Sequence, residues 1–168
     1  MAPSRAPRRP WRTSGSVDLV VPADRAAVYA VVADVTRIGE RSPECHTAVW
    51  LPGAPPGTLG AVFRGSNRAQ WAARWSRRCE VLVADPGRAF AFRTLPTPVV
   101  PDSTTWRYDL EPVDGGTRVT HSYEITKPLP GPLRAFTGAV LPQHRDMRPQ
   151  MRVNLEALRA QFAAVPTP

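Results

Sequence analysis

Side chains with an apolar body and a polar tip recur on two neighbouring segments in the second half of the chain. Trp106 and Tyr108 alternate with polar residues in the first segment, and His121 and Tyr123 do so in the second. Such side chains can line an apolar site and offer hydrogen bonds to a ligand. His121 could also act as a general acid or base, because the ordinary pKa of histidine lies near neutrality. Core packing, with the histidine hydrogen-bonded to Tyr108 or a backbone carbonyl, is the alternative.

Arg77 is another candidate for chemistry, since it shares one face of an alternating run with Trp75. Strict alternation would point Arg77 inward, where it needs a carboxylate or an anionic or enolate oxygen of a ligand. A β-bulge near Arg77 and Arg78 would instead turn the guanidinium outward. Asn67 and Arg68 raise the same question of orientation at the end of an earlier run. In a cyclase, Arg77 or Arg68 would polarise a carbonyl of a poly-β-ketone, while His121 or Tyr108 relays a proton.

The segments that carry Tyr108 and His121 are predicted to form one β-hairpin, from Ser103 to Ile125. Each run alternates apolar and polar residues with a period of two, which is typical of a strand with one buried face. Between the runs lies Asp114-Gly115-Gly116. Glycine adopts the positive φ that tight hairpin turns require, and aspartate can bond its own backbone. The turn therefore aligns the two amphipathic strands.

The remaining pattern predicts an α+β architecture. A first strand runs from Gly15 to Val21, and a helix that opens at Pro22-Ala23-Asp24 ends near Asp34, followed by a short helical turn over 35–40. Further strands are predicted over 44–51, 60–67, 74–84 and 89–94. The last element is a long amphipathic helix, which begins or kinks near Pro149 and carries an apolar stripe made of Met147, Met151, Leu155, Leu158 and Phe162. Only this helix is long enough to cover the apolar face of the sheet.

Length and charge indicate one domain with a basic tail. The chain has 168 residues and a formal charge of +8, and all its basic residues except Lys127 are arginines. Residues 1–14 are rich in Pro and Arg and are predicted to be disordered, with a single domain over 15–164. Removing the charges of Arg5, Arg8, Arg9 and Arg12 from +8 leaves about +4. No nucleic-acid-binding motif accompanies this charge, so a nucleic-acid partner is not expected.

Several classes of protein are disfavoured by what the sequence lacks. Cys45 and Cys79 are the only cysteines, and their spacing favours neither a disulfide framework nor a metal site. The chain shows no apolar run long enough to span a membrane and no signal-peptide pattern, so a cytoplasmic location is expected. Phosphate-binding loops, nucleophile elbows and metal-ligand spacings are also missing. No cofactor and no metal are therefore predicted.

Several stretches, taken together and in order, resemble the START-like, or helix-grip, superfamily, also called SRPBCC. They are PADRAAVYAVVADVTRIGERSPE, GAVFRGSNR, RWSRRCEVLVADPGRAFAFRT and WRYDLEPVDGGTRVTHSYEI, and the resemblance covers Ser14 to roughly Ala163. Within the superfamily the chain is most similar to the polyketide cyclase/dehydrase and lipid-transport group. The resemblance implies a seven-stranded antiparallel sheet wrapped around the C-terminal helix, with two short helices between the first two strands and an apolar cavity inside.

On this fold, the inward faces of the strands would line the cavity and bind a ligand. The expected lining residues are Trp50, Phe63, Asn67, Trp75, Arg77, Phe92, Trp106, Tyr108, His121 and Tyr123, with Met147 and Met151 above them. The first hypothesis is binding or transport of a small hydrophobic lipid, aromatic or polycyclic molecule. The alternative is a polyketide cyclase/dehydrase-type enzyme that uses Arg77, His121 and Tyr108. A third hypothesis, from another class, is a regulatory or toxin-like module that acts through its arginine-rich tail.

Overall fold

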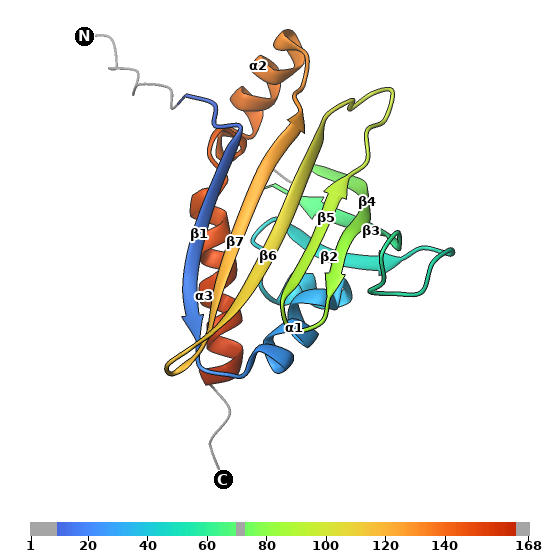
Figure 1. Cartoon of the computed structure of the whole chain (residues 1–168). Helices are drawn as coiled ribbons and strands as arrows, with labels where there is room; N and C mark the ends of the chain where they lie inside the picture. The colour runs from blue at the N-terminus through green and yellow to red at the C-terminus, as the bar shows by residue number, and fades with distance from the viewer. Residues whose placement is uncertain (1–9, 70–72, 164–168) are drawn as a thin grey trace, which may run out of the picture.

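The computed structural model describes residues 10–69 and 73–163, which form one antiparallel sheet with helices on its concave side (Figure 1). The strand order is β1-β7-β6-β5-β4-β3-β2. The elements in chain order are β1 (Ser14–Val21), α1 (Arg25–Ala33), the 3-10 helix η1 (Val35–Glu40), β2 (Cys45–Trp50), β3 (Val62–Arg68), β4 (Arg74–Asp85), β5 (Ala89–Thr94), β6 (Ser103–Val113), β7 (Gly116–Lys127), α2 (Gly131–Val140), the 3-10 helix η2 (Pro142–Arg145) and α3 (Arg148–Ala163).

This architecture confirms the predicted helix-grip fold. Strands β2 to β7 follow one another as antiparallel neighbours, and β1 closes the order by pairing with β7. The helix α3 contacts β1 and β7, and in Figure 1 it runs along the side of the sheet that faces away from the viewer. Met151, Leu155 and Leu158 of α3 are almost fully buried there. The predicted apolar stripe therefore packs against the sheet.

Local sequence explains where the first helices begin. The side chain of Asp24 accepts hydrogen bonds from the backbone N–H groups of Ala26 and Ala27, both at 2.9 Å, and so caps α1. Asp34 then accepts a bond from the Thr36 N–H at 3.1 Å and begins η1. Two aspartates thus stabilise the helix pair that the sequence predicts between the first two strands.

Two elements near the C-terminus are missing from the sequence-based prediction. Residues 131–140 form α2 and residues 142–145 form η2, and neither element was predicted between the hairpin and the last helix. Helix α2 buries only Gly138 and leaves Phe136 and Val140 exposed. Because it presents no apolar stripe to the core, hydrophobic periodicity could not reveal it.

The structure describes residues 10–14 of the predicted tail, and part of this segment packs against the rest of the fold. The indole of Trp11 lies 5.6 Å from the guanidinium carbon of Arg145, and the carbonyl of Thr13 accepts a hydrogen bond from the Ile125 N–H at 2.7 Å. Strand β1 already begins at Ser14. Trp11 provides the apolar surface that makes this packing favourable. The prediction of disorder for residues 1–9 lies outside the described residues.

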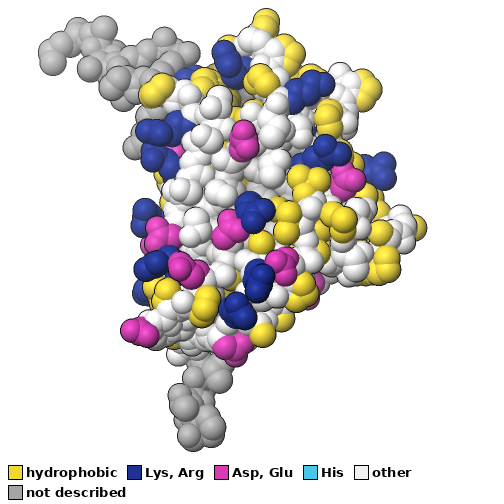
Figure 2. Space-filling model, viewed as in Figure 1, with side chains coloured by type: hydrophobic (Ala, Val, Ile, Leu, Met, Phe, Trp, Pro, Cys, Tyr) yellow, Lys and Arg dark blue, Asp and Glu magenta, His cyan; other side chains and the backbone are white. Residues whose placement is uncertain are grey.

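The convex face of the sheet is exposed to solvent and carries many polar side chains. Figure 2 shows basic and acidic side chains interspersed on this side. Three ion pairs of the sheet illustrate the mixture: Arg93 with Glu80, Arg107 with Asp109 and Arg118 with Glu111. The apolar side chains of the sheet are therefore left to the concave side, where α1 and α3 lie.

Candidate functional site: a cavity between the sheet and α3

A cavity of about 200 Å³ lies on the concave side of the sheet. Its walls come from strands β2 to β7, from the end of η1 and the loop after it, and from η2 and α3. Most of the residues predicted to line a cavity are on these walls, namely Phe63, Asn67, Trp75, Arg77, Phe92, Trp106, Tyr108, His121, Met147 and Met151. Alternation on the strands thus brings together side chains far apart in the sequence.

Trp50 and Tyr123 lie outside this cavity. The ring of Trp50 packs edge-on against Phe63 with the ring centroids 5.6 Å apart. The hydroxyl of Tyr123 donates to the backbone carbonyl of Arg12 at 3.4 Å. Both side chains face the concave side as predicted, but Trp50 is near the end of an edge strand and Tyr123 reaches the N-terminal segment instead.

Arg77 points toward the cavity and has a carboxylate partner. Its Nη1 lies 2.7 Å from Oδ1 of Asp102, and its Nη2 donates to the carbonyls of Asp102 at 3.0 Å and Leu95 at 3.3 Å. The pairing of β3 with β4 is regular from Arg68 with Arg74 to Val62 with Glu80, so there is no bulge at this arginine in that ladder. The register shift of β4 against β5 falls between Val81 and Val83. Of the two orientations left open by the sequence, the inward one is observed.

Tyr108, His121 and Asn154 form a buried polar cluster in the cavity wall. The hydroxyl of Tyr108 donates to Oδ1 of Asn154 at 3.2 Å, and the Tyr108 ring stacks on His121 with centroids 4.0 Å apart and planes inclined by 13°. All three residues are at most 5% exposed. Nδ1 of His121 is buried and has no hydrogen-bond partner among the residues that the structure describes. Such a cluster can orient a polar atom of a ligand within an apolar space.

Burial and a neighbouring cation keep His121 neutral. Desolvation, followed by the positive charge of Arg41, lowers the pKa of His121 to about 3. Arg41 is itself buried, and its guanidinium donates to the carbonyls of Val31 at 3.3 Å and Val32 at 3.2 Å, at the end of α1. Burial also raises the pKa of Tyr108, so this side chain keeps its hydroxyl proton. At neutral pH the cluster therefore offers neutral hydrogen-bonding groups.

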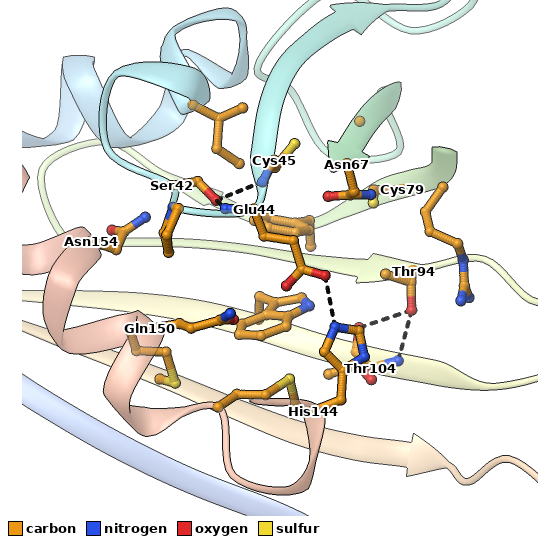
Figure 3. Close-up of a pocket in the computed structure, with 18 of the residues that line it drawn as sticks. Ser42, Glu44, Cys45, Asn67, Cys79, Thr94, Thr104, His144, Gln150 and Asn154 are labelled. Atoms are coloured by element: carbon orange, nitrogen blue, oxygen red, sulfur yellow. Dashed lines mark hydrogen bonds and ion pairs between the residues drawn. The ribbon is translucent and has the colours of Figure 1, made fainter. Parts of the chain in front are cut away.

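Glu44 and His144 meet on a less buried side of the cavity. Oε1 of Glu44 lies 2.7 Å from Nε2 of His144, and Figure 3 shows the two side chains approaching each other from different parts of the chain. The His144 ring also packs edge-on against Trp75, with centroids 6.1 Å apart. The side chain of Glu44 is 17% exposed and that of His144 is 25% exposed. The contact ties η2 to the loop before β2.

The two cysteines are part of the wall but are poor nucleophiles. Burial raises the pKa of Cys45 to about 11 and that of Cys79 to about 12, so both remain thiols at neutral pH. His46, which follows Cys45, is exposed and does not line the cavity. Across residues 10–69 and 73–163 there is no group of three or more His, Cys, Asp or Glu side chains that could hold a metal ion.

Sequence reasoning missed several residues of the wall. Asp102 lies in the loop before β6, Glu44 in the loop before β2, and His144 in η2. Strand or helix periodicity carries no signal for such positions. Asn154 follows Met151 by three residues and therefore shares its helix face, so spacing alone could have identified it. Thr104 shares the alternation of Trp106 and Tyr108 and could have been found in the same way.

Comparison with known proteins places this geometry among related folds. A family model described as polyketide cyclase/dehydrase and lipid transport matches residues 12–163. No curated protein sequence matches the chain. Among the part of the chain that the structure describes, no helix has the length and apolar character needed to cross a membrane.

Solved structures share the fold at low sequence identity. StfQ, a di-domain ARO/CYC from the steffimycin biosynthetic pathway, is 16% identical with a TM-score of 0.71, over 93% of this chain and 52% of that one. Protein CV1439 from Chromobacterium violaceum is 14% identical with a TM-score of 0.65, over 91% and 99% of the two chains. Ara h 8.0201 is 14% identical with a TM-score of 0.64, over 90% and 98%. The chain thus spans about half of the di-domain protein and nearly all of the other two.

Proposed function

Since the chain belongs to the polyketide cyclase/dehydrase and lipid-transport family, we propose that it binds a small hydrophobic molecule with one or two rings and a hydrogen-bonding oxygen. The observation that carries the proposal is the cavity, in which Tyr108, His121 and Asn154 form a buried polar cluster among aromatic and Met side chains. Aromatic rings supply flat apolar walls, and methionine adapts to irregular ligands. The neutral cluster suits a hydroxyl or carbonyl group.

The cavity volume favours a ligand of this size. An apolar cavity of roughly 150 Å³ accommodates benzene in another protein, so a cavity of about 200 Å³ suits a monocyclic or bicyclic ligand. A tetracyclic molecule would require the walls to move apart. We further propose that the protein acts in the cytoplasm, where its free cysteines Cys45 and Cys79 would stay reduced.

Non-catalytic binding is favoured over acid-base catalysis by the state of His121. A catalytic acid or base works best with a pKa near the working pH, whereas the pKa of His121 is lowered to about 3. Arg77 is already engaged by Asp102 at 2.7 Å. Neither side chain is therefore poised for the proton relay that a cyclase would need.

A cyclase/dehydrase-type reaction in the same cavity is the second candidate. It is supported by the family description and by the fold shared with StfQ, a di-domain ARO/CYC. The two candidates differ in one measurable respect. If His121→Ala and Arg77→Ala abolish turnover of a poly-β-ketone without weakening its binding, the protein is an enzyme and the carrier proposal fails.

The binding proposal is tested with 2-naphthol and naphthalene as probes. Native mass spectrometry of the purified protein first shows whether a molecule co-purifies, and fluorescence titration then gives the two affinities. We expect wild type to bind 2-naphthol more tightly, and Tyr108→Phe to lower that preference about fivefold to tenfold by removing one hydrogen-bonding group. Tyr123→Phe is the matched control, since its hydroxyl bonds Arg12 outside the cavity. Absence of binding of either probe to wild type contradicts the proposal.

A further inference from the structure

A second, smaller cavity adjoins the first. Its volume is about 70 Å³, and its outer walls come from the segment before β1, from the connection between β7 and α2, and from α2 itself. Trp11, Ile125, Pro128 and Leu129 give these walls an apolar character, with Arg134 and Thr137 beside them. An apolar extension of a ligand would suit this space.

The two cavities share part of their walls. Asp102, Thr104, His144 and Met147 line both of them. Because one residue borders both spaces at each of these four positions, the two cavities are separated there by single residues.

Two of the four shared side chains are held by polar contacts: Asp102 accepts from Arg77 at 2.7 Å, and His144 lies 2.7 Å from Glu44. The third residue, Thr104, is held in β6 by its backbone N–H, which donates to Oγ1 of Thr94 at 2.8 Å. The side chain of Met147 has no polar group to hold it, and methionine is unbranched and flexible. Met147 is 8% exposed, so its side chain is packed between the two cavities. Packing alone, without side-chain hydrogen bonds, therefore holds this side chain in place.

We infer that the two cavities are chambers of one ligand site and that Met147 sets the maximum length of ligand that the site accepts. The inference rests on the proposed binding function. A ligand would place its oxygen near Tyr108 and Asn154 and direct its apolar substituent toward Met147. The second chamber then becomes available to longer substituents only when Met147 is shortened.

A series of 4-alkylphenols from ethyl to octyl tests this assignment by calorimetric titration. Each methylene that enters the site raises affinity about fourfold, and methylenes beyond its end add nothing, so affinity plotted against chain length gives a plateau. We expect the plateau of Met147→Ala to lie at least about two carbons beyond that of wild type, as the methionine side chain extends about that far past its Cβ. Leu129→Trp, which fills the second chamber, should return the plateau of Met147→Ala to the wild-type length.

The controls separate this inference from the binding proposal. Met151→Ala is the matched control, because it also shortens a methionine but Met151 lines only the first cavity. It should therefore shift the plateau by fewer carbons than Met147→Ala does. Met147→Val serves if the alanine variant does not fold, as judged by circular dichroism. An unmoved plateau in folded Met147 variants overturns the inference alone, whereas failure of wild type to bind 4-ethylphenol overturns the binding proposal with it.

Discussion

His121 is a titratable side chain that the fold keeps uncharged. Its ring is stacked on Tyr108 and is 5% exposed, and Arg41 contributes a nearby positive charge. Protonation would leave two cations in a buried space, with the added cost of desolvating the second one. The histidine therefore contributes a neutral ring and a hydrogen-bonding nitrogen to the wall, and this state has a consequence for stability.

We expect the free energy of unfolding to fall as pH decreases from about 6.5 toward the folded-state pKa of about 3. In this window the unfolded chain binds a proton at His121 and the folded protein does not, so acid favours unfolding by about 1.4 kcal/mol per pH unit. Above about pH 6.5 the contribution of His121 to the free energy of unfolding no longer changes with pH. Urea unfolding at a series of pH values measures the slope, and His121→Gln should be less sensitive to acid. Equal slopes in wild type and variant would contradict the assignment.

Arg77 and Asp102 differ from His121 in forming an ion pair beside the cavity, with Nη1 and Oδ1 2.7 Å apart. Their side chains are 14% and 18% exposed. Asp102→Asn keeps the shape but removes the negative charge, so we expect it to lower the free energy of unfolding by about 2 to 4 kcal/mol. Urea denaturation gives the value. Glu80→Gln is a matched control, because Glu80 pairs with Arg93 in a more exposed position, and its effect should stay below about 1 kcal/mol. If both variants lost similar free energies of unfolding, the Arg77–Asp102 pair would contribute no more to stability than the exposed pair.

At the level of elements, the β6-β7 hairpin depends on two glycines with different constraints. Gly115 has φ of 85° and open space around its missing Cβ, whereas Gly116 has φ of 141° and a Cβ would lie 2.1 Å from the carbonyl oxygen of Val21. Gly115 therefore needs glycine only for its backbone conformation. Gly116 also needs it for close approach to the end of β1.

Gly116→Ala should consequently be more damaging than Gly115→Ala. For Gly115→Ala we expect a loss of about 1 kcal/mol, the usual cost of a left-handed conformation in a residue with a Cβ. For Gly116→Ala the loss should exceed about 3 kcal/mol, because the strands β1 and β7 must also separate. Thermal and urea unfolding of the two variants measure the difference. Equal losses would show that the end of β1 yields easily to the added methyl group.

Elements with a periodic buried face could be predicted from the sequence, and the others could not. The alternation of Trp106 and Tyr108 placed both on the concave side, as did that of Trp75 and Arg77. Helix α2 has no such face, since Phe136 is 66% exposed, and it was missed together with η2. The partner of Arg77 was missed for a related reason, because Asp102 lies in a loop, where contacts depend on tertiary packing.

On the scale of the whole molecule, the cavity depends on segments from both ends of the chain. The N-terminal segment at Trp11 to Thr13 lines the second cavity, and α3 covers the first. Trp11 also lies close to Gly138, where an added Cβ would meet the indole at 2.7 Å. The described part of the tail therefore belongs to the fold. The arginines before it, Arg5, Arg8 and Arg9, lie outside the described residues.

Deletion of Met1 to Arg9 separates ligand binding from the hypothesis of a regulatory or nucleic-acid-binding module. The deletion removes the three positive charges of Arg5, Arg8 and Arg9 and keeps Trp11 and the other described residues that line the two cavities. We expect the affinity for 4-ethylphenol to be unchanged, as measured by calorimetric titration.

A nucleic-acid module would behave differently: the full chain would bind a DNA duplex with an affinity that falls steeply with salt, and the deletion would reduce both the affinity and the salt dependence. Trp11→Ala in the full chain is the complementary change, because it opens the second cavity and keeps every arginine. If salt-dependent DNA binding is lost in the deletion but kept in Trp11→Ala, the arginines themselves contact a partner, and binding in the cavity is not the protein's only function.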